Sequence, residues 1–199
     1  MNISFTKSFS ESLKTLYWQN TLPYKAYSFF RYDFPRFLKN IWKFRKALYN
    51  HYWFDHHGTL MFMEIALTDM ANKIEKLGTE VDSSRLKKVE KMHRVIQLIK
   101  NYNEDLYIEM AEKELGEVVL HELEFEPSPD HPGSYQLVDK NTPEENEHNR
   151  KVFDRAKEIG EQEWNELWDI IKGQDYSKFD ENIDFDNQFD GSGLRGWWD

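Results

Sequence analysis

The last ten residues of the chain, DGSGLRGWWD, hold the side chains best suited to binding a ligand. Glycine tolerates positive backbone φ angles, so a glycine-rich turn can direct successive N–H groups at one anion. Arginine can add a planar, bidentate donor for a phosphate, and a tryptophan ring can stack on a nucleobase. The residues predicted to bind a small anionic ligand, such as a nucleotide, are Gly191, Ser192, Gly193, Arg195, Trp197 and Trp198.

The same residues have a purely structural interpretation. The two tryptophans can fill the core, with Arg195 paired to a nearby aspartate. Burying a tryptophan removes about 150 to 250 Å² from water, which stabilises the folded state strongly. Both interpretations predict that the end of the chain is fixed against the rest of the protein.

Glutamate and histidine occur in spacings that suit metal binding. Glu-x-x-His pairs on facing helices, with further glutamates, bind two metal ions in helical bundles, and clustered imidazoles can hold a single ion. Glutamate is frequent in this chain, so such spacings arise by chance and we predict no metal site and no cofactor. The residues concerned are Glu90, His93, Glu145 and His148 for the pairs, and His51, Asp55, His56 and His57 for the cluster.

Motifs of enzymes are missing from the sequence. It holds no Walker loop, no GxGxxG and no nucleophile elbow, and it has no cysteine to act as a nucleophile or a thiolate ligand. We therefore expect a protein without catalytic activity. A metal-dependent enzyme built on a helical bundle is the alternative.

The charge is unevenly distributed. The formal net charge is −10, which argues against general nucleic-acid binding because like charges repel. The first 50 residues nevertheless carry nine Lys and Arg against two Asp and Glu. A basic face at helical spacing follows Pro35, beside a stripe of aromatic and aliphatic residues. The basic face consists of Arg36, Lys39, Lys43 and Lys46.

The pattern leaves two interpretations of this basic amphipathic segment open. It can be an ordinary packed helix whose cations face the acidic remainder of the chain. It can also lie on an anionic membrane or dock on phosphates.

Hydrophobic periodicity predicts a mainly α fold: a helical bundle with one small β-hairpin at about 118–139 and an ordered C-terminal arm. Asp33 followed by Pro35 predicts a helix start, and Thr142 with Glu145 predicts a capping box. The domain is expected to span 1–173, with an acidic and aromatic arm at 174–199 packed on it. The alternative is that the arm serves as a linear motif for another protein. The expected elements are helices at 34–52, 59–77, 83–99, 104–115 and 143–172, and strands at 117–126 and 135–139.

No segment has the length and apolarity of a membrane span, and the N-terminus is too polar for a secretory signal. The absence of cysteine is typical of a reducing compartment. We therefore expect a soluble, cytoplasmic protein.

Four segments between Tyr52 and Asp199 carry a resemblance to known sequences. The segments are YWFDHHGTLMFMEIALTDM, DSSRLKKVEKMHRVIQLI, EWNELWDIIKGQDY and DGSGLRGWWD. They resemble a set of uncharacterised tailed-bacteriophage proteins that end in a Gly-x-Gly-x-Arg-Gly-Trp-Trp-Asp motif. The resemblance implies a phage origin, with a place in the host cytoplasm or the virion, and supplies no mechanism.

Together these observations predict a non-enzymatic phage accessory protein that binds a host defence component or a small anionic ligand. The alternative is a structural or assembly protein of the virion, in which the basic helix and the acidic arm mediate contacts between subunits. The expected partners are thus a host or phage protein, a small anionic ligand, or further copies in a homo-oligomer.

Overall fold

The computed structural model describes residues 18, 20–52, 56–121, 124–129, 131, 133–138 and 140–197. The chain forms two compact units that divide between Gly58 and Thr59. The division expected at residue 173 does not coincide with this one. The arm after Gly173 belongs to the second unit, because it is bonded to the helices of that unit.

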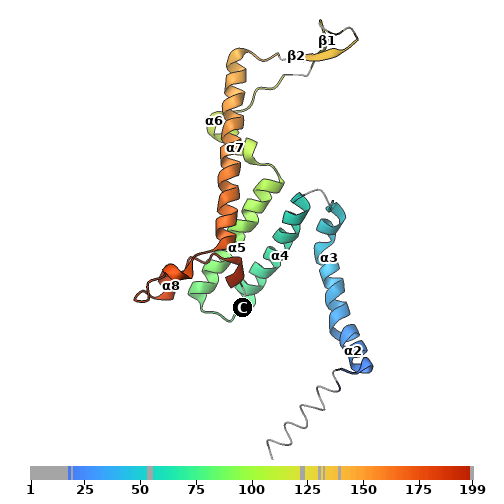
Figure 1. The fold of residues 1–199 in the computed structure, drawn as a ribbon, viewed down its shortest axis with the longest axis vertical. Helices are drawn as coiled ribbons and strands as arrows, with labels where there is room; N and C mark the ends of the chain where they lie inside the picture. Colours follow the sequence, from blue (N-terminus) through green and yellow to red (C-terminus); the bar gives the residue numbers. More distant parts are fainter. Residues whose placement is uncertain are drawn as a thin grey trace, which may run out of the picture. The chain divides into compact units, whose positions relative to one another are not determined.

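The described part of the first unit is helical from Leu22 to Asn50 (Figure 1). It comprises α2 (Leu22–Ser28), a π-helical turn η1 (Phe29–Asp33) and α3 (Phe34–Asn50). Helix α2 begins after the extended residue Thr21, with a proline in its first turn. Helix α3 begins at Phe34, as predicted, but Asp33 does not cap it. Asp33 has helical torsions, makes no capping bond and instead pairs with Arg36 at 2.7 Å.

The π-turn explains how the helix continues through Pro35. Proline has no N–H group to donate to the carbonyl one turn earlier, which usually breaks or kinks a helix. Here the N–H of Phe34 donates to the carbonyl of Phe29, five residues earlier, which is the π-helical pattern. The wider turn accommodates the missing donor, so helix α3 follows η1 directly.

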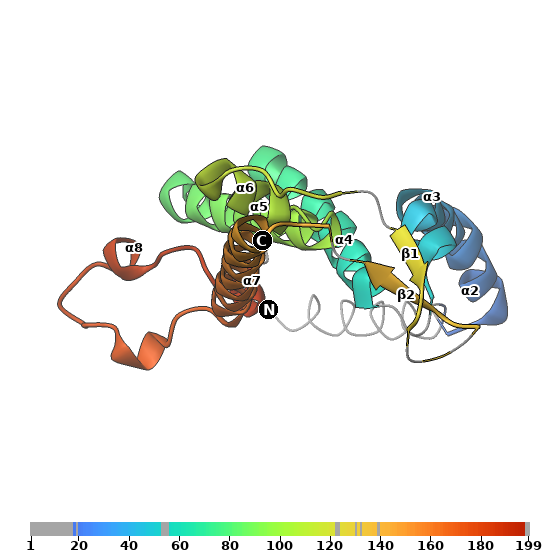
Figure 2. The same cartoon turned by 90° about the horizontal axis from the view of Figure 1, so that it is seen from above.

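The second unit is a helical bundle. Its helices are α4 (His56–Leu77), α5 (Asp82–Asn103), α6 (Tyr107–Leu115) and α7 (Pro143–Lys172). Helix α5 lies between α4 and the long helix α7, and α6 lies against α7 (Figures 1 and 2). One half of α7 packs against α5 and the other half against α6. The predicted mainly α bundle with one small hairpin is confirmed.

Two buried clusters lie along α7. The larger cluster joins α4, α5, α7 and Trp197, and the smaller one joins α6 and α7. Helix α7 starts with the predicted capping box, in which the Thr142 hydroxyl accepts from the Glu145 N–H and the Glu145 carboxylate accepts from the Thr142 N–H. The helix ends at Gly173, which has a φ of +76°.

The hairpin consists of β1 (Glu124–Pro127) and β2 (Tyr135–Val138), paired antiparallel with Phe125 opposite Leu137. The strand expected at 117–126 is shorter because its first part is held by α7. The Asn149 side chain accepts from the Val119 N–H at 2.9 Å and donates to the Val119 carbonyl at 2.7 Å. These bonds occupy the backbone groups of Val119 that a strand partner would need.

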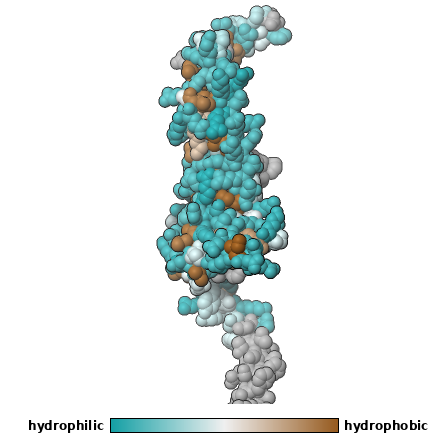
Figure 3. Space-filling model, turned by 90° about the vertical axis from the view of Figure 1, so that its left-hand side faces the viewer, coloured by the Kyte–Doolittle hydropathy of each residue, from teal (hydrophilic) through white to brown (hydrophobic). Residues whose placement is uncertain are grey.

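The C-terminal arm contains the short elements η2 (Tyr176–Lys178), α8 (Phe185–Gln188) and η3 (Leu194–Gly196). The face of the second unit seen in Figure 3 is mostly hydrophilic, with scattered hydrophobic side chains. Among the described residues, no helix is both long enough and apolar enough to cross a bilayer.

Candidate functional site

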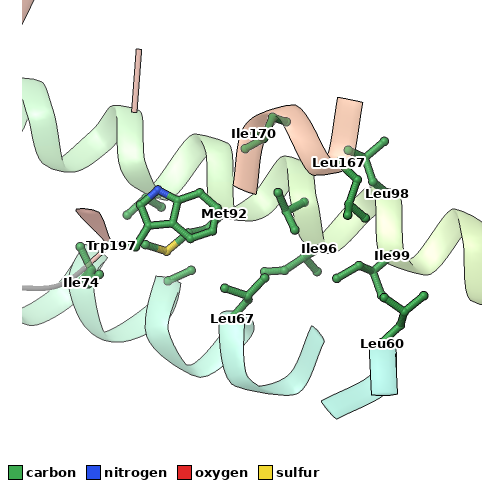
Figure 4. Packing of buried hydrophobic residues seen from close by; sticks show 13 residues of the cluster. Leu60, Leu67, Ile74, Met92, Ile96, Leu98, Ile99, Leu167, Ile170 and Trp197 are labelled. Carbon is green, nitrogen blue, oxygen red and sulfur yellow. The ribbon is translucent and has the colours of Figure 1, made fainter. Parts of the chain in front are cut away.

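Trp197, predicted to bind a ligand, is a core residue in this structure. It is 2% exposed and belongs to the same buried cluster as Ile74 and Met92 (Figure 4). Its indole Nε1–H donates to the Gly191 carbonyl at 2.7 Å, so the one polar atom of the ring is satisfied. A ring buried in this way cannot stack on a base. Its surroundings are those expected of a tryptophan that fills the core. Trp198 lies outside the described residues.

The glycine turn uses its N–H groups inside the protein. The Ser192 N–H donates to Asp190 Oδ1 at 2.8 Å, and the Gly193 N–H donates to the Ile170 carbonyl at 2.8 Å. The Gly196 N–H donates to the Gly193 carbonyl at 2.8 Å. These three donors are therefore not directed at an open anion site, contrary to the geometry expected of the turn.

The glycines instead permit close approach of backbones. Gly191 has a φ of +87°, and a Cβ atom there would collide with the backbone of Lys87 on α5. A Cβ atom on Gly173 would collide with the backbone of Gly193. The turn is glycine-rich because it packs directly on α5 and on the end of α7.

Arg195 is the member of the predicted site that remains accessible. Arg195 is exposed on η3, and its guanidinium forms no ion pair with a described residue. The expected pairing with an aspartate is therefore not seen within the described part of the chain. A ligand role for Arg195 stays a prediction.

Polar contacts complete the attachment of the arm to α5. Lys87 Nζ donates to the Asp186 carbonyl at 2.5 Å and to the Phe189 carbonyl at 2.8 Å. The Gln174 amide accepts from the Asp190 N–H at 2.9 Å. The side chain of Phe189 is buried and stacks on Phe185, with 5.2 Å between ring centroids. The arm is thus docked on its own chain.

A small recess lies between the arm and the start of α5. Its cavity measures about 270 Å³ and is lined by Glu80, Lys88 and the rings of Tyr176, Phe185 and Phe189. The buried Lys88 forms an ion pair with Glu80. Ligand pockets usually measure about 300 to 1,000 Å³, so this recess is small for one.

The metal candidates are separated or engaged elsewhere. Glu90 and His93 are both exposed on α5, while Glu145 is part of the capping box. His148 Nε2 donates to the Glu117 carbonyl at 3.0 Å. Among the described residues no three His, Cys, Asp or Glu side chains are grouped to hold a metal ion; Asp55 lies outside those residues.

A polar network between α5 and α7, centred on the buried Asn101, has no local signal in the sequence. Asn101, 2% exposed, donates its amide to both carboxylate oxygens of Glu163, at 3.1 and 2.9 Å, and accepts from Gln97. Arg94 makes two hydrogen bonds to the Glu166 carboxylate, at 2.7 and 2.6 Å, and these hold the pKa of Glu166 below its usual value. The shifted pKa of Glu166 is therefore explained by its bonds to Arg94 within the protein.

Tyr107 gives this region a measurable pH dependence. Burial, assisted by the negative charge of Glu163, raises the pKa of Tyr107 from 10.0 to about 12. Because the folded state favours the neutral phenol, its contribution to stability is complete below pH 10 and is lost as the pH rises toward 12. Between these values, we expect the free energy of unfolding to fall more steeply in the wild type than in Tyr107→Phe, by at most about 1.4 kcal/mol per pH unit.

Urea unfolding at several alkaline pH values measures this difference. Tyr49→Phe is the control, since Tyr49 is 88% exposed, and it is expected to keep the wild-type slope. Equal slopes for Tyr107→Phe and the wild type would contradict the assignment.

Helix α3 carries the second candidate site on two opposite faces. Successive helical residues are about 100° apart, so large apolar side chains gather on one side and the basic face lies on the other. The apolar residues are exposed, from 38% for Phe34 to 88% for Tyr49. We call this set the apolar face: Phe34, Phe37, Leu38, Ile41, Trp42, Leu48 and Tyr49.

The basic face is as expected from the sequence: Arg36, Lys39 and Lys46 are exposed and Lys43 is half-buried. Arg45 lies on the same side of α3 as the apolar face, but its side chain folds back onto Trp42. Its guanidinium carbon is 4.1 Å from the centroid of the Trp42 ring, and its Nη1 donates to the Trp42 carbonyl at 2.6 Å. The positive charge is thus held against an aromatic ring.

Comparisons with protein-family models, with curated proteins and with solved structures found no match for this chain.

Proposed function

We propose that this chain is a non-enzymatic bacteriophage accessory protein that binds a macromolecular partner through helix α3 and the preceding α2 and η1. The resemblance of its sequence to phage proteins supports the origin. The observation that carries the binding role is the apolar face, which leaves seven large side chains at least 38% exposed along one side of a 17-residue helix. Contiguous exposed apolar surface of this kind marks an interaction site in proteins that otherwise bury such side chains.

The second unit supports this role as a folded body. Its core joins three helices and the arm, and its visible face is mostly hydrophilic (Figure 3). An attachment helix on one unit and a stable body on the other suit an adaptor, in which one part docks and the other part acts or recruits.

A small anionic ligand on the arm is the second candidate, favoured by the accessible guanidinium of Arg195. The N–H groups of the glycine turn argue against it, because they are bonded within the protein. A virion assembly role would use the same exposed helix, with another protein subunit as the partner.

Substituting the apolar face tests the proposal. In extracts of cells that make the protein, we expect the wild type to migrate in complexes larger than its 24.1 kDa chain on gel filtration, or to sediment with particulate material. Phe37→Ser/Ile41→Ser is expected to migrate as the free chain, since two apolar contacts are lost.

The matched control is Phe153→Ser/Ile108→Ser, which makes the same changes at exposed helical positions of the second unit. It is expected to behave as the wild type. Identical migration of all three proteins would contradict the proposal.

A further inference from the structure

We infer that the α2–η1–α3 segment binds the surface of a lipid bilayer that contains anionic lipids, with the helix axis in the membrane plane. This inference rests on the proposed function and names the partner of the same surface. Three features favour lipid over a protein partner: the two faces of α3, the aromatic residues of the segment, and the lysines of the basic face.

The two faces of α3 match the requirements of the membrane interface. Interfacial helices place Trp, Phe and Leu on one face and Lys and Arg on the other, so that apolar side chains enter the acyl boundary while cations meet lipid headgroups. Helix α3 has both faces, and the sequence from Phe34 to Asn50 contains no acidic residue. A helix of 17 residues is about 25 Å long, which presents the basic face to several headgroups at once.

Aromatic residues with a polar atom recur along the whole segment. Tyrosine and tryptophan are enriched at headgroup level, where an apolar ring and a polar atom are both accommodated. The Arg45 guanidinium lies over the Trp42 ring, so this cation also stays beside an amphipathic ring. The exposed members within 22–50 are Tyr27, Tyr32, Trp42 and Tyr49, and the exposed Trp18 and Tyr52 flank the segment.

The lysines of the basic face favour a lipid surface over a protein as the partner. Protein interfaces are depleted in lysine, whereas lysine and arginine near an anionic membrane each add attraction. The basic face has three lysines among its four residues. The protein as a whole has a net charge of −10, so attraction to an anionic surface must come from this segment and not from the overall charge.

Vesicle sedimentation with the full chain tests the inference. The probes are vesicles of phosphatidylglycerol and phosphatidylcholine in equal parts, and vesicles of phosphatidylcholine alone, at about 0.1 M salt. We expect binding to the anionic vesicles and at least tenfold weaker binding to the neutral ones. Lys39→Gln/Lys46→Gln is expected to bind the anionic vesicles about 25-fold more weakly, or about fivefold for each lysine.

The matched control removes two lysines from the second unit. Lys151→Gln/Lys157→Gln makes the same charge change at exposed positions of α7 and is expected to bind as the wild type. Glutamine is a good helix former, and circular dichroism checks that all variants stay folded. Failure of the wild type to bind anionic vesicles, or equal binding by the two double variants, would overturn the inference.

The two proposals fail separately. If the wild type does not bind vesicles, but Phe37→Ser/Ile41→Ser still migrates as the free chain in cell extract, the surface docks a protein. The lipid inference is then wrong and the proposed function stands. If neither experiment separates the variants from their controls, both are wrong.

Discussion

Replacing Trp197 by alanine is expected to lower the free energy of unfolding by about 3 to 5 kcal/mol, the range for removing a large aromatic side chain from a core. The ring is 2% exposed in the cluster formed by α4, α5 and α7, and its N–H group bonds the Gly191 carbonyl. Its removal leaves a cavity and takes away the main apolar anchor of the arm. Urea denaturation followed by circular dichroism measures the change.

Trp168→Ala is the control for this prediction. Trp168 is 46% exposed on α7 and contacts Trp164 edge to face, with 5.6 Å between centroids. Its loss is expected to cost about 1 kcal/mol, as for an exposed aromatic pair. If Trp197→Ala unfolds at the same urea concentration as Trp168→Ala, the arm is not anchored as described.

The second large effect is expected at Gly191. Alanine there must adopt a φ of +87° and place its Cβ atom against the backbone of Lys87. The positive φ alone costs about 1 to 2 kcal/mol, and the collision can be relieved only by moving the arm away from α5. We expect Gly191→Ala to lower the free energy of unfolding by about 3 kcal/mol or more, or to release the arm to added protease.

Substitution of Gly133 separates the cost of the positive φ angle from the cost of the collision. Gly133 has a φ of +90°, and nothing lies within 4 Å of the place where its Cβ would be. Gly133→Ala therefore reports the torsional cost without the collision and is expected to stay within about 2 kcal/mol of the wild type. Equal effects at Gly133 and Gly191 would show that the close approach to Lys87 is absent.

Much of the helical fold follows from local sequence. The spacing of apolar residues in α4 and α5 and the capping box at Thr142 are local features, and each predicted its element. Asp33 followed by Pro35 is typical of a capped helix start, but Asp33 makes no capping bond because the π-turn η1 leads directly into α3. The sequence predicts too long a first strand, because the bonds that hold Val119 come from Asn149 on a distant helix.

The site residues show why function was harder to predict than fold. A glycine-rich turn serves an anion or a close backbone contact equally well, and only the packing of Gly191 on Lys87 distinguishes the two. The pairing of Asn101 with Glu163 joins residues 62 positions apart, so no local pattern announces it. The basic and apolar faces of α3 were predictable, because they depend on helical periodicity alone.

Hydrogen–deuterium exchange on the full chain, with and without anionic vesicles, tests the central claim most directly. A helix with little buried side-chain surface opens readily, so the amides of 22–50 are expected to exchange fast in the free protein and to become protected on vesicles. The amides of 59–197 are expected to exchange at the same rate in both states. Protection that appears in the second unit, or none in 22–50, would contradict the assignment of α2–η1–α3 as the docking segment.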